Sequence, residues 1–388
     1  MEIKSQKNNL KVGIVSFYYY PELSGPIIRF MRYEKYLKKK KIDFYYIVPN
    51  RKNKNKKNLF LIDVKNKKNI NNFFLRLFLF FKKNKDLNII LFLNLSPVLL
   101  FLLPFIKLLG KKVIFVNTMS SVSKNSFIKN ILKKIIFNFF DRVVVSTKYL
   151  QKELLQLKLF SNKIQIIHNG VDFKKFQCGL NEKNFFKKKM NLGSNFTFLF
   201  VGNLIHRKGI AELLQNWKKF KDKTKKKDQL IIIGQKKIFK EINPIIDGDL
   251  KYHQEIDFYL KEKMKKKLNI KFISFKKNIT DYFKSSDVFC FPSRLEGTPN
   301  VLLEAYASKC LVMMNKFKGY STELGENNKN FILFKVDNDF SNLFFEISKN
   351  INKYSKKIEN TFFLMQKFQD IDITIERYEK LFRYLSRK

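Results

Sequence analysis

Two acidic side chains, Glu296 and Glu304, bracket a short segment that could bind an anion. The residues next to Glu296 are Gly297, Thr298, Pro299, Asn300 and Val301. Thr298 is a suitable N-cap and Pro299 suits the first helical position, so the residue types predict a helix that begins there. The free N–H groups and the dipole at such a helix start attract an anion, and Gly297 lets backbone approach a ligand closely.

Carboxylates accept hydrogen bonds and do not donate them, so Glu296 and Glu304 are suited to binding hydroxyls. Together with the anion site between them, they fit a ligand with hydroxyls on both sides of a diphosphate, as in a nucleotide-sugar. The same pattern is compatible with an ordinary strand-to-helix connection that carries two surface glutamates.

A second loop with suitable chemistry runs from Gly202 to Gly209, directly after the apolar run 196–201. It contains Asn203, Arg207 and Lys208. Lysine at the far end of a glycine-bounded loop is a good point charge for phosphate. Arg207 either adds to that charge or is solvated.

The elements that must position these loops follow from alternating apolar runs and helical segments. Expected strands of the first half are 11–17, 44–48, 89–93, 112–117, 141–147 and 163–167, with helices at 27–40 and 148–157. Expected strands of the second half are 196–201, 230–234, 270–275 and 286–291, with helices at 210–221 and 280–284. This alternation predicts an α/β chain of two Rossmann-like domains, 1–175 and 190–365, that face a central cleft. The lysine-rich segment 173–194 has few strand signals and is interpreted as the linker.

The composition is strongly basic, with 78 Lys and Arg against 33 Asp and Glu and a formal charge of +45. Such a charge suggests nucleic acid or an anionic membrane surface. Lys, Asn, Ile and Phe have A/T-rich codons, so a biased genome is an equally good explanation of the bulk of the charge. No nucleic-acid-binding motif accompanies it, and we expect no nucleic-acid partner.

Scattered cysteines and histidines give no ligand spacing, so the sequence predicts no metal and no other cofactor. Residues 1–10 lack the apolar core of a signal peptide, and no uninterrupted apolar stretch reaches about 18 residues. We therefore expect a cytoplasmic protein. Segment 73–83 is apolar and aromatic with basic flanks, which is typical of an interfacial membrane helix or of a core-facing one.

The order and spacing of several short motifs resemble those of the family-4 retaining glycosyltransferases, which have the GT-B fold. The likeness covers nearly the whole chain and is strongest from Phe196 to Ala307. The residues that carry it are Pro21-Glu22-Leu23-Ser24-Gly25, Ser146, Asn169-Gly170-Val171-Asp172, Val201-Gly202, Lys208-Gly209, Ile233-Gly234, Asp287, Pro292-Ser293, Glu296-Gly297 and Glu304-Ala305.

The resemblance implies metal-independent transfer of a sugar, with retention, from a UDP- or GDP-sugar to an acceptor hydroxyl. Glu296 and Lys208 would be catalytic: Glu296 would contact the sugar hydroxyls, Glu304 would hold the ribose, and Lys208 would neutralise the diphosphate. The full donor set would be Gly202, Asn203, Arg207, Lys208, Glu296, Gly297, Thr298, Pro299, Asn300, Val301 and Glu304. The N-terminal half would bind the acceptor near Ser24, Gly25 and Asn117, and a final helix, 366–388, would cross back onto that half.

Three positions depart from the family pattern. Asn203 stands where the family usually has arginine, and the loop 117–120 lacks the usual histidine. The family's helix after the second glutamate usually ends in a glycine before a proline, and this chain has segment 308–311 there.

Two hypotheses follow. One is a hexosyltransferase that acts on a lipid-linked or growing cell-surface polysaccharide, lipopolysaccharide or capsule, as a peripheral protein on the inner face of the cell membrane. The other is a GT-B-fold partner or scaffold that has lost turnover.

Overall fold

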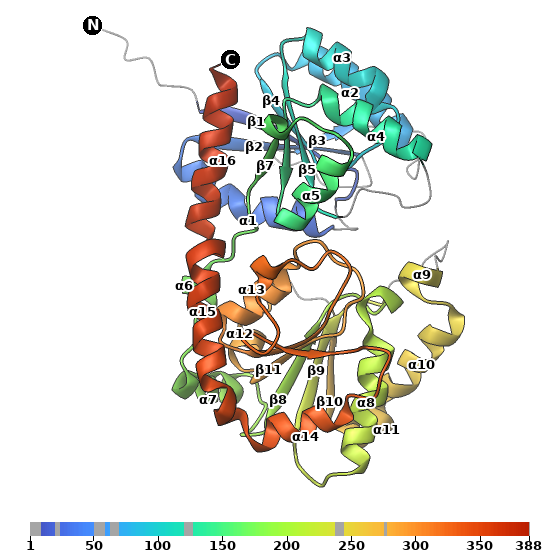
Figure 1. Ribbon diagram of the computed structural model, residues 1–388, viewed down its shortest axis with the longest axis vertical. Helices are drawn as coiled ribbons and strands as arrows, with labels where there is room; N and C mark the ends of the chain where they lie inside the picture. Colours follow the sequence, from blue (N-terminus) through green and yellow to red (C-terminus); the bar gives the residue numbers. More distant parts are fainter. Residues whose placement is uncertain are drawn as a thin grey trace, which may run out of the picture. The chain divides into compact units, whose positions relative to one another are not determined.

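The computed structural model describes residues 9–19, 24–49, 59–62, 70–119, 127–236, 244–274 and 278–387. The chain divides into two compact units, Met1–Gly170 with Ile371–Lys388, and Val171–Asp370. Each unit is a parallel β-sheet with helices on both faces (Figure 1). The predicted α/β class with two Rossmann-like domains is confirmed.

The sheet of unit 1 has the strand order β3-β2-β1-β4-β5-β6-β7. The chain builds outward from β1 to β3 and then returns to place β4 on the other side of β1, so the order reverses between β1 and β4. Its strands are β1 (Leu10–Val15), β2 (Ile42–Pro49), β3 (Leu59–Ile62), β4 (Ile89–Phe92), β5 (Lys112–Asn117), β6 (Arg142–Val145) and β7 (Ile164–Ile166).

Alternating side chains of these strands form two apolar layers. Val12 and Ile14 contribute to the layer covered by α1 (Gly25–Lys39) and α16 (Ile371–Ser386). Val15 and Phe92 contribute to the opposite layer, which is covered by α2 (Ile70–Lys83), α3 (Leu99–Leu108), α4 (Phe127–Phe139) and α5 (Lys148–Gln156). The last helix therefore belongs to the core of unit 1 (Figure 1).

The sheet of unit 2 repeats this arrangement with the order β10-β9-β8-β11-β12-β13, which reverses between β8 and β11. Trp217 is fully buried on the face covered by α8, α10, α11 and α14, and the other face is covered by α6, α12, α13 and α15. The strands are β8 (Thr197–Val201), β9 (Gln229–Gly234), β10 (Ile270–Ser274), β11 (Val288–Phe291), β12 (Leu311–Asn315) and β13 (Ile332–Phe334). The helices are α6 (Phe173–Phe176), α7 (Leu180–Lys189), α8 (Ile210–Asp222), α9 (Pro244–Asp247), α10 (Leu250–Leu260), α11 (Glu262–Leu268), α12 (Thr280–Lys284), α13 (Asn300–Ala307), α14 (Ser341–Lys349) and α15 (Ser355–Gln369).

The interpretation of segment 173–194 as a linker is wrong, because α6 and α7 pack within unit 2. The buried Lys183 donates from Nζ to the carbonyl oxygens of Ser286 and Ser308, at 2.6 and 3.2 Å. Lys187 is also buried and pairs with Asp287 at 2.6 Å. The aliphatic stems of lysine bury well, so a lysine-rich sequence concealed a packed helix.

The apolar segment after Asn88 forms strand β4, as predicted, followed by helix α3. None of the helices in the described residues is long and apolar enough to span a membrane. In α2, Phe73, Phe74 and Phe81 are fully buried, which confirms the core-facing alternative for that side of the helix.

The buried pair on α7 gives a test of this packing. We expect Lys187→Ala to lower the free energy of unfolding by about 3 kcal/mol, because the carboxylate of Asp287, only 14% exposed, would lose its cation. Chemical denaturation measures the change. Lys188→Ala is the matched control, since Lys188 is exposed on the same helix, and it should cost less than about 0.5 kcal/mol. Equal effects of the two substitutions would contradict the packing of α7.

Candidate functional site

The two loops singled out in the sequence meet at the carboxyl edge of the second sheet. Gly202 follows β8 and Pro292 follows β11, and these two strands are parallel neighbours. The strand order reverses between them, and open α/β sheets bind ligands outside the carboxyl ends of the strands at such a reversal. The topology of unit 2 alone therefore makes this edge the candidate site.

Glu296 lies between two cations at this edge. Its Oε1 atom accepts a short hydrogen bond from Nζ of Lys208 and lies 3.1 Å from Nη1 of Arg207. The Lys208 and Glu296 side chains are only 12% and 11% exposed. The stem of Lys208 passes over Gly202, and its ammonium lies 6.0 Å from the ring centre of Phe291. Glu296, which is predicted to bind the sugar, and Lys208, which is predicted to bind the phosphates, therefore contact each other.

The electrostatics of the cluster favour an ionised carboxylate. Burial raises the pKa of Glu296, but the positive charges of Lys208 and Arg207 outweigh burial, so this pKa lies below its ordinary value. Burial lowers the pKa of Lys208, and Arg207 lowers it further, while Glu296 restores only part of the loss. The three side chains together carry one excess positive charge, which suits an anionic ligand.

Arg294 joins the two loops, and sequence reasoning missed it. Its backbone N–H donates to the carbonyl of Arg207 at 2.9 Å, and its guanidinium donates to the carbonyl of His206 at 3.0 Å. The same guanidinium pairs with Glu212 at 2.8 Å and Asp337 at 2.6 Å. These partners come from two segments far from Arg294 in the sequence, 206–212 and Asp337, so no local pattern could have indicated the role.

Two glycines allow the loops to approach each other. Gly209 has φ +66°, and a Cβ atom there would lie 2.3 Å from the carbonyl oxygen of Pro292. Gly319 has φ +98°, and a Cβ atom there would lie 2.0 Å from the carbonyl oxygen of Glu296. Gly319 was not predicted, because its neighbour across the loop is 23 residues away in the sequence. Both positions require glycine for conformation and for space.

Helix α13 begins one residue later than predicted. Pro299 is the N-cap, with φ −74° and ψ 115°, and Thr298 precedes it instead of capping the helix. The extended conformation of Pro299 leaves Asn300 as the first helical residue, and Gly297 is buried beside Glu296. On α13, Val301 is half-buried, whereas Leu302 and Ala305 are fully buried.

Glu304 is completely buried on α13, and Glu296 is 9% exposed. The alternative of two surface glutamates is therefore wrong. Asn203 is half-buried directly after Gly202 and carries no charge, so Arg207 and Lys208 are the basic groups of the first loop.

The residues predicted on the acceptor side belong to unit 1. Ser24 is the N-cap of α1 without a side-chain capping bond, and Gly25 starts that helix with open space where a Cβ would stand. Asn117 is buried at the end of β5. Ser24 and Gly25 follow β1 and Asn117 ends β5, and these two strands flank β4 in the first sheet. The neighbouring motif residues 20–23 and Ser120 lie outside the described residues.

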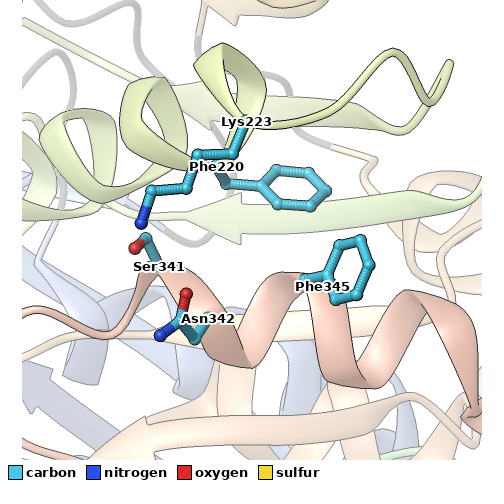
Figure 2. A pocket seen from close by; sticks show the side chains of 5 residues that line it. All are labelled: Phe220, Lys223, Ser341, Asn342 and Phe345. Atoms are coloured by element: carbon cyan, nitrogen blue, oxygen red, sulfur yellow. The ribbon is translucent and has the colours of Figure 1, made fainter.

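A shallow hollow of about 250 Å³ lies between α8 and α14 (Figure 2). Figure 2 shows the rings of Phe220 and Phe345 on one side of it and the side chains of Lys223, Ser341 and Asn342 on the other. Helix α8 runs back from the carboxyl edge, so its last residues lie at the amino edge of the sheet. The hollow is therefore separate from the candidate site.

The described part of the chain contains no group of three or more His, Cys, Asp or Glu side chains that could hold a metal ion. Metal independence stays a prediction.

Comparison with protein families identifies the segment that contains both loops. Residues 181–362 match the family described as "Glycosyl transferases group 1". The matched segment makes up just under half of the chain. It includes α7 and the whole candidate site, from Gly202 to Glu304.

Several curated proteins similar to this segment are named as glycosyltransferases of polysaccharide biosynthesis. The capsular polysaccharide biosynthesis glycosyltransferase CapH of Staphylococcus aureus is 31% identical over 188 residues, which are 48% of this chain and 46% of that protein. A UDP-Gal:alpha-D-GlcNAc-diphosphoundecaprenol alpha-1,3-galactosyltransferase of Escherichia coli is 29% identical over 178 residues, 42% of each protein. The chain spans about half the length of the curated relatives it matches.

Solved structures show a similar fold over nearly the whole chain. Anabaena HepE, crystallised with UDP and glucose, gives a TM-score of 0.74 at 12% identity and covers 97% of this chain and 100% of that one. WaaG, a glycosyltransferase involved in lipopolysaccharide biosynthesis, gives 0.68 at 14% identity, with coverage of 96% and 99%. At these identities the likeness concerns the fold, which is that of the GT-B glycosyltransferases.

The lowered pKa of Glu296 has a consequence for stability. An acid with a lowered folded-state pKa stabilises the protein above its ordinary pKa of 4.5, and this stabilisation is lost as the pH falls from there through the lowered value. We expect Glu296→Gln to reduce the free energy of unfolding by roughly 3 kcal/mol at neutral pH, and the difference to shrink in acid. Denaturation of both proteins across pH measures it.

A double variant identifies the origin of that effect. If Lys208 supplies the attraction, Glu296→Gln combined with Lys208→Met should cost less than the sum of the two single substitutions. A pH-independent cost, or strict additivity, would contradict the ion pair.

Proposed function

We propose that this protein is a retaining glycosyltransferase of the family-4 type, which moves a hexose from a nucleotide-sugar to an acceptor hydroxyl during cell-surface polysaccharide synthesis. The observation that supports it most is the buried cluster of Arg207, Lys208 and Glu296. It lies at the strand-order reversal of a domain that matches the group 1 glycosyltransferases. A solvated surface would not bury these three charges together.

The donor diphosphate competes with Glu296 for the two cations of this cluster. Lys208 and Arg207 turn from the carboxylate to the phosphates, and the first N–H groups of α13 face the same anion. Glu296 is then released to accept hydrogen bonds from the sugar hydroxyls, while Glu304 binds the ribose. The cations stabilise the charge that develops on the departing nucleoside diphosphate, so the reaction proceeds without a metal.

Arg207 takes the part that the family gives to an arginine directly after the first glycine, where this chain has Asn203. This substitution keeps two basic groups in the first loop. It is supported by the 3.1 Å contact between Arg207 and Glu296, which directs the guanidinium into the cluster.

The proposed donor is a UDP-sugar, with a GDP-sugar as the alternative. UDP occurs in the name of the Escherichia coli relative and in the structure of HepE. The proposed acceptor is a lipid-linked or growing surface glycan, because the named acceptor of that relative is a diphosphoundecaprenol. A lipid-linked acceptor places the enzyme at the inner face of the cell membrane.

The first experiment tests donor binding. We expect UDP to raise the melting temperature of the purified protein, because a ligand that binds the folded state stabilises it by mass action. Lys208→Ala should abolish the shift, whereas Lys316→Ala, an exposed lysine after β12, should leave it unchanged. If no UDP-, GDP- or CMP-sugar produces a shift, the chain is the non-catalytic GT-B partner that the Asn203 position also suggests.

The second experiment tests turnover. With donor and a lipid-linked acceptor, Glu296→Ala should lower the rate of nucleoside diphosphate release by about 10²-fold or more, because the sugar loses its anchoring carboxylate. Lys208→Ala should have an effect of similar size on kcat, since removal of one charge-stabilising group typically costs about 10²–10³. Full activity in both variants would refute the site assignment.

A further inference from the structure

Unit 1 has an apolar outer surface that the proposed transfer reaction does not use. We define the outer helical face as the solvent side of α2, α3 and α4. Six large apolar side chains on it are each more than half exposed: Leu75 at 59%, Leu79 at 62%, Phe101 at 71%, Phe105 at 54%, Leu108 at 82% and Ile128 at 71%. Single exposed leucines are ordinary, but a continuous set of this kind marks an interaction surface.

The three helices form one continuous layer. They pack on the same core and cover the same face of the first sheet (Figure 1). α3 contacts α2 and α4, and the rings of Phe78 and Phe105 meet edge to face with centres 5.8 Å apart. The exposed side chains therefore belong to one surface.

In helix α3, the exposed apolar residues are not the ones that pack the helix onto the core of unit 1. Leu99, Leu103 and Ile106 are fully buried and anchor the helix to the core. Phe101, Phe105 and Leu108 lie on its other side, where a surface helix of a globular protein normally carries polar residues. A helix with large apolar residues on both sides requires something to cover its outer side.

The charges on the outer helical face have one sign. The sequences of α2, α3 and α4 contain no aspartate or glutamate. Their charged residues are Arg76, Lys82, Lys83, Lys107, Lys129, Lys133 and Lys134. Lys107 pairs with Asp141 at 3.1 Å, and Lys82, Lys83 and Lys129 are exposed.

We propose that the outer helical face docks on an anionic lipid bilayer, with its leucine and phenylalanine side chains in the interface and its lysines on the lipid phosphates. Apolar side chains beside an excess of basic charges are the composition that binds such surfaces. A symmetric contact with a second copy would bring like charges together. α3 has ten residues, about 15 Å, roughly half the thickness of the hydrocarbon layer, so it lies on the membrane and does not cross it.

This proposal deepens the proposed function and rests on it in one respect, since docking would bring the enzyme to a lipid-linked acceptor. Binding to lipid is measured without donor or acceptor. Its failure is therefore distinguishable from failure of the transfer reaction.

The test is flotation of the full chain with vesicles of phosphatidylglycerol and phosphatidylcholine, compared with vesicles of phosphatidylcholine alone. We expect binding to the anionic vesicles, and a loss of about tenfold or more in the partition constant for Phe101→Ser combined with Leu108→Ser. The matched control is Leu250→Ser combined with Phe363→Ser. These residues are 67% and 62% exposed in unit 2, and their replacement should leave partition unchanged.

A second pair of variants tests the charge. Lys82→Gln combined with Lys83→Gln should weaken binding to anionic vesicles about 30-fold, because each lysine near an anionic surface contributes about 1 kcal/mol. Lys225→Gln combined with Lys227→Gln removes two exposed lysines of unit 2 and should have no comparable effect. Every variant should keep the melting temperature and the UDP-induced shift of the parent protein, since none of these residues belongs to the donor site.

Three results would overturn the proposal. The first is no binding to either kind of vesicle. The second is an equal loss of binding in the unit 2 controls, which would show a diffuse electrostatic effect. The third is a dimer in light scattering that Phe101→Ser with Leu108→Ser dissociates, which would show that a second copy covers the outer helical face.

Discussion

Glu296 is buried at the carboxyl edge of the second sheet, and it remains ionised there because Lys208 and Arg207 lie against its carboxylate. Much of the local structure serves this contact. Gly202 leaves room for the lysine stem, and Gly319 lets the backbone of Glu296 pass close by. Arg294 ties the backbone of the first loop to the second loop and to Glu212, and this keeps the two cations within reach of the carboxylate. A buried charge is stable only with such partners, and this requirement couples two loops that are 88 residues apart.

The same contact makes the site responsive to an anion. Two cations share one carboxylate, and the phosphates of a ligand offer them a stronger partner. Displacement of Glu296 would then prepare an acceptor for sugar hydroxyls, so that the interaction which stabilises the empty site also arranges the occupied one. The arginine that the family usually places after the first glycine is replaced by Asn203, and the position of Arg207 keeps the number of cations at two.

The structure assigns the many lysines of this chain to different roles. Lys183 and Lys187 are buried against the second sheet and hold α7 in place. Lys208 balances a buried carboxylate. The lysines of α2 and α4 surround exposed leucine and isoleucine side chains, and all their charges have one sign. A total charge of +45 contains none of these distinctions, because it is the burial and the partner of each lysine that decide what it does.

The sequence by itself determined the alternation of strands and helices, because buried parallel strands need continuous apolar runs, and β5, α8 and α12 lie within one residue of their expected bounds. It also indicated the two loops of the site, since glycine, lysine and glutamate stand directly after predicted strands. It could not show β12 or β13 or the packing of α7, where short apolar runs and lysine stems give weak local signals. Only the tertiary structure decided that Lys208 and Arg207 contact Glu296, that Glu304 is completely buried, and that Arg294 and Gly319 support the loops. These contacts join segments distant in sequence, and the physical requirement that creates them, a partner for every buried charge, can be evaluated only once the chain is folded.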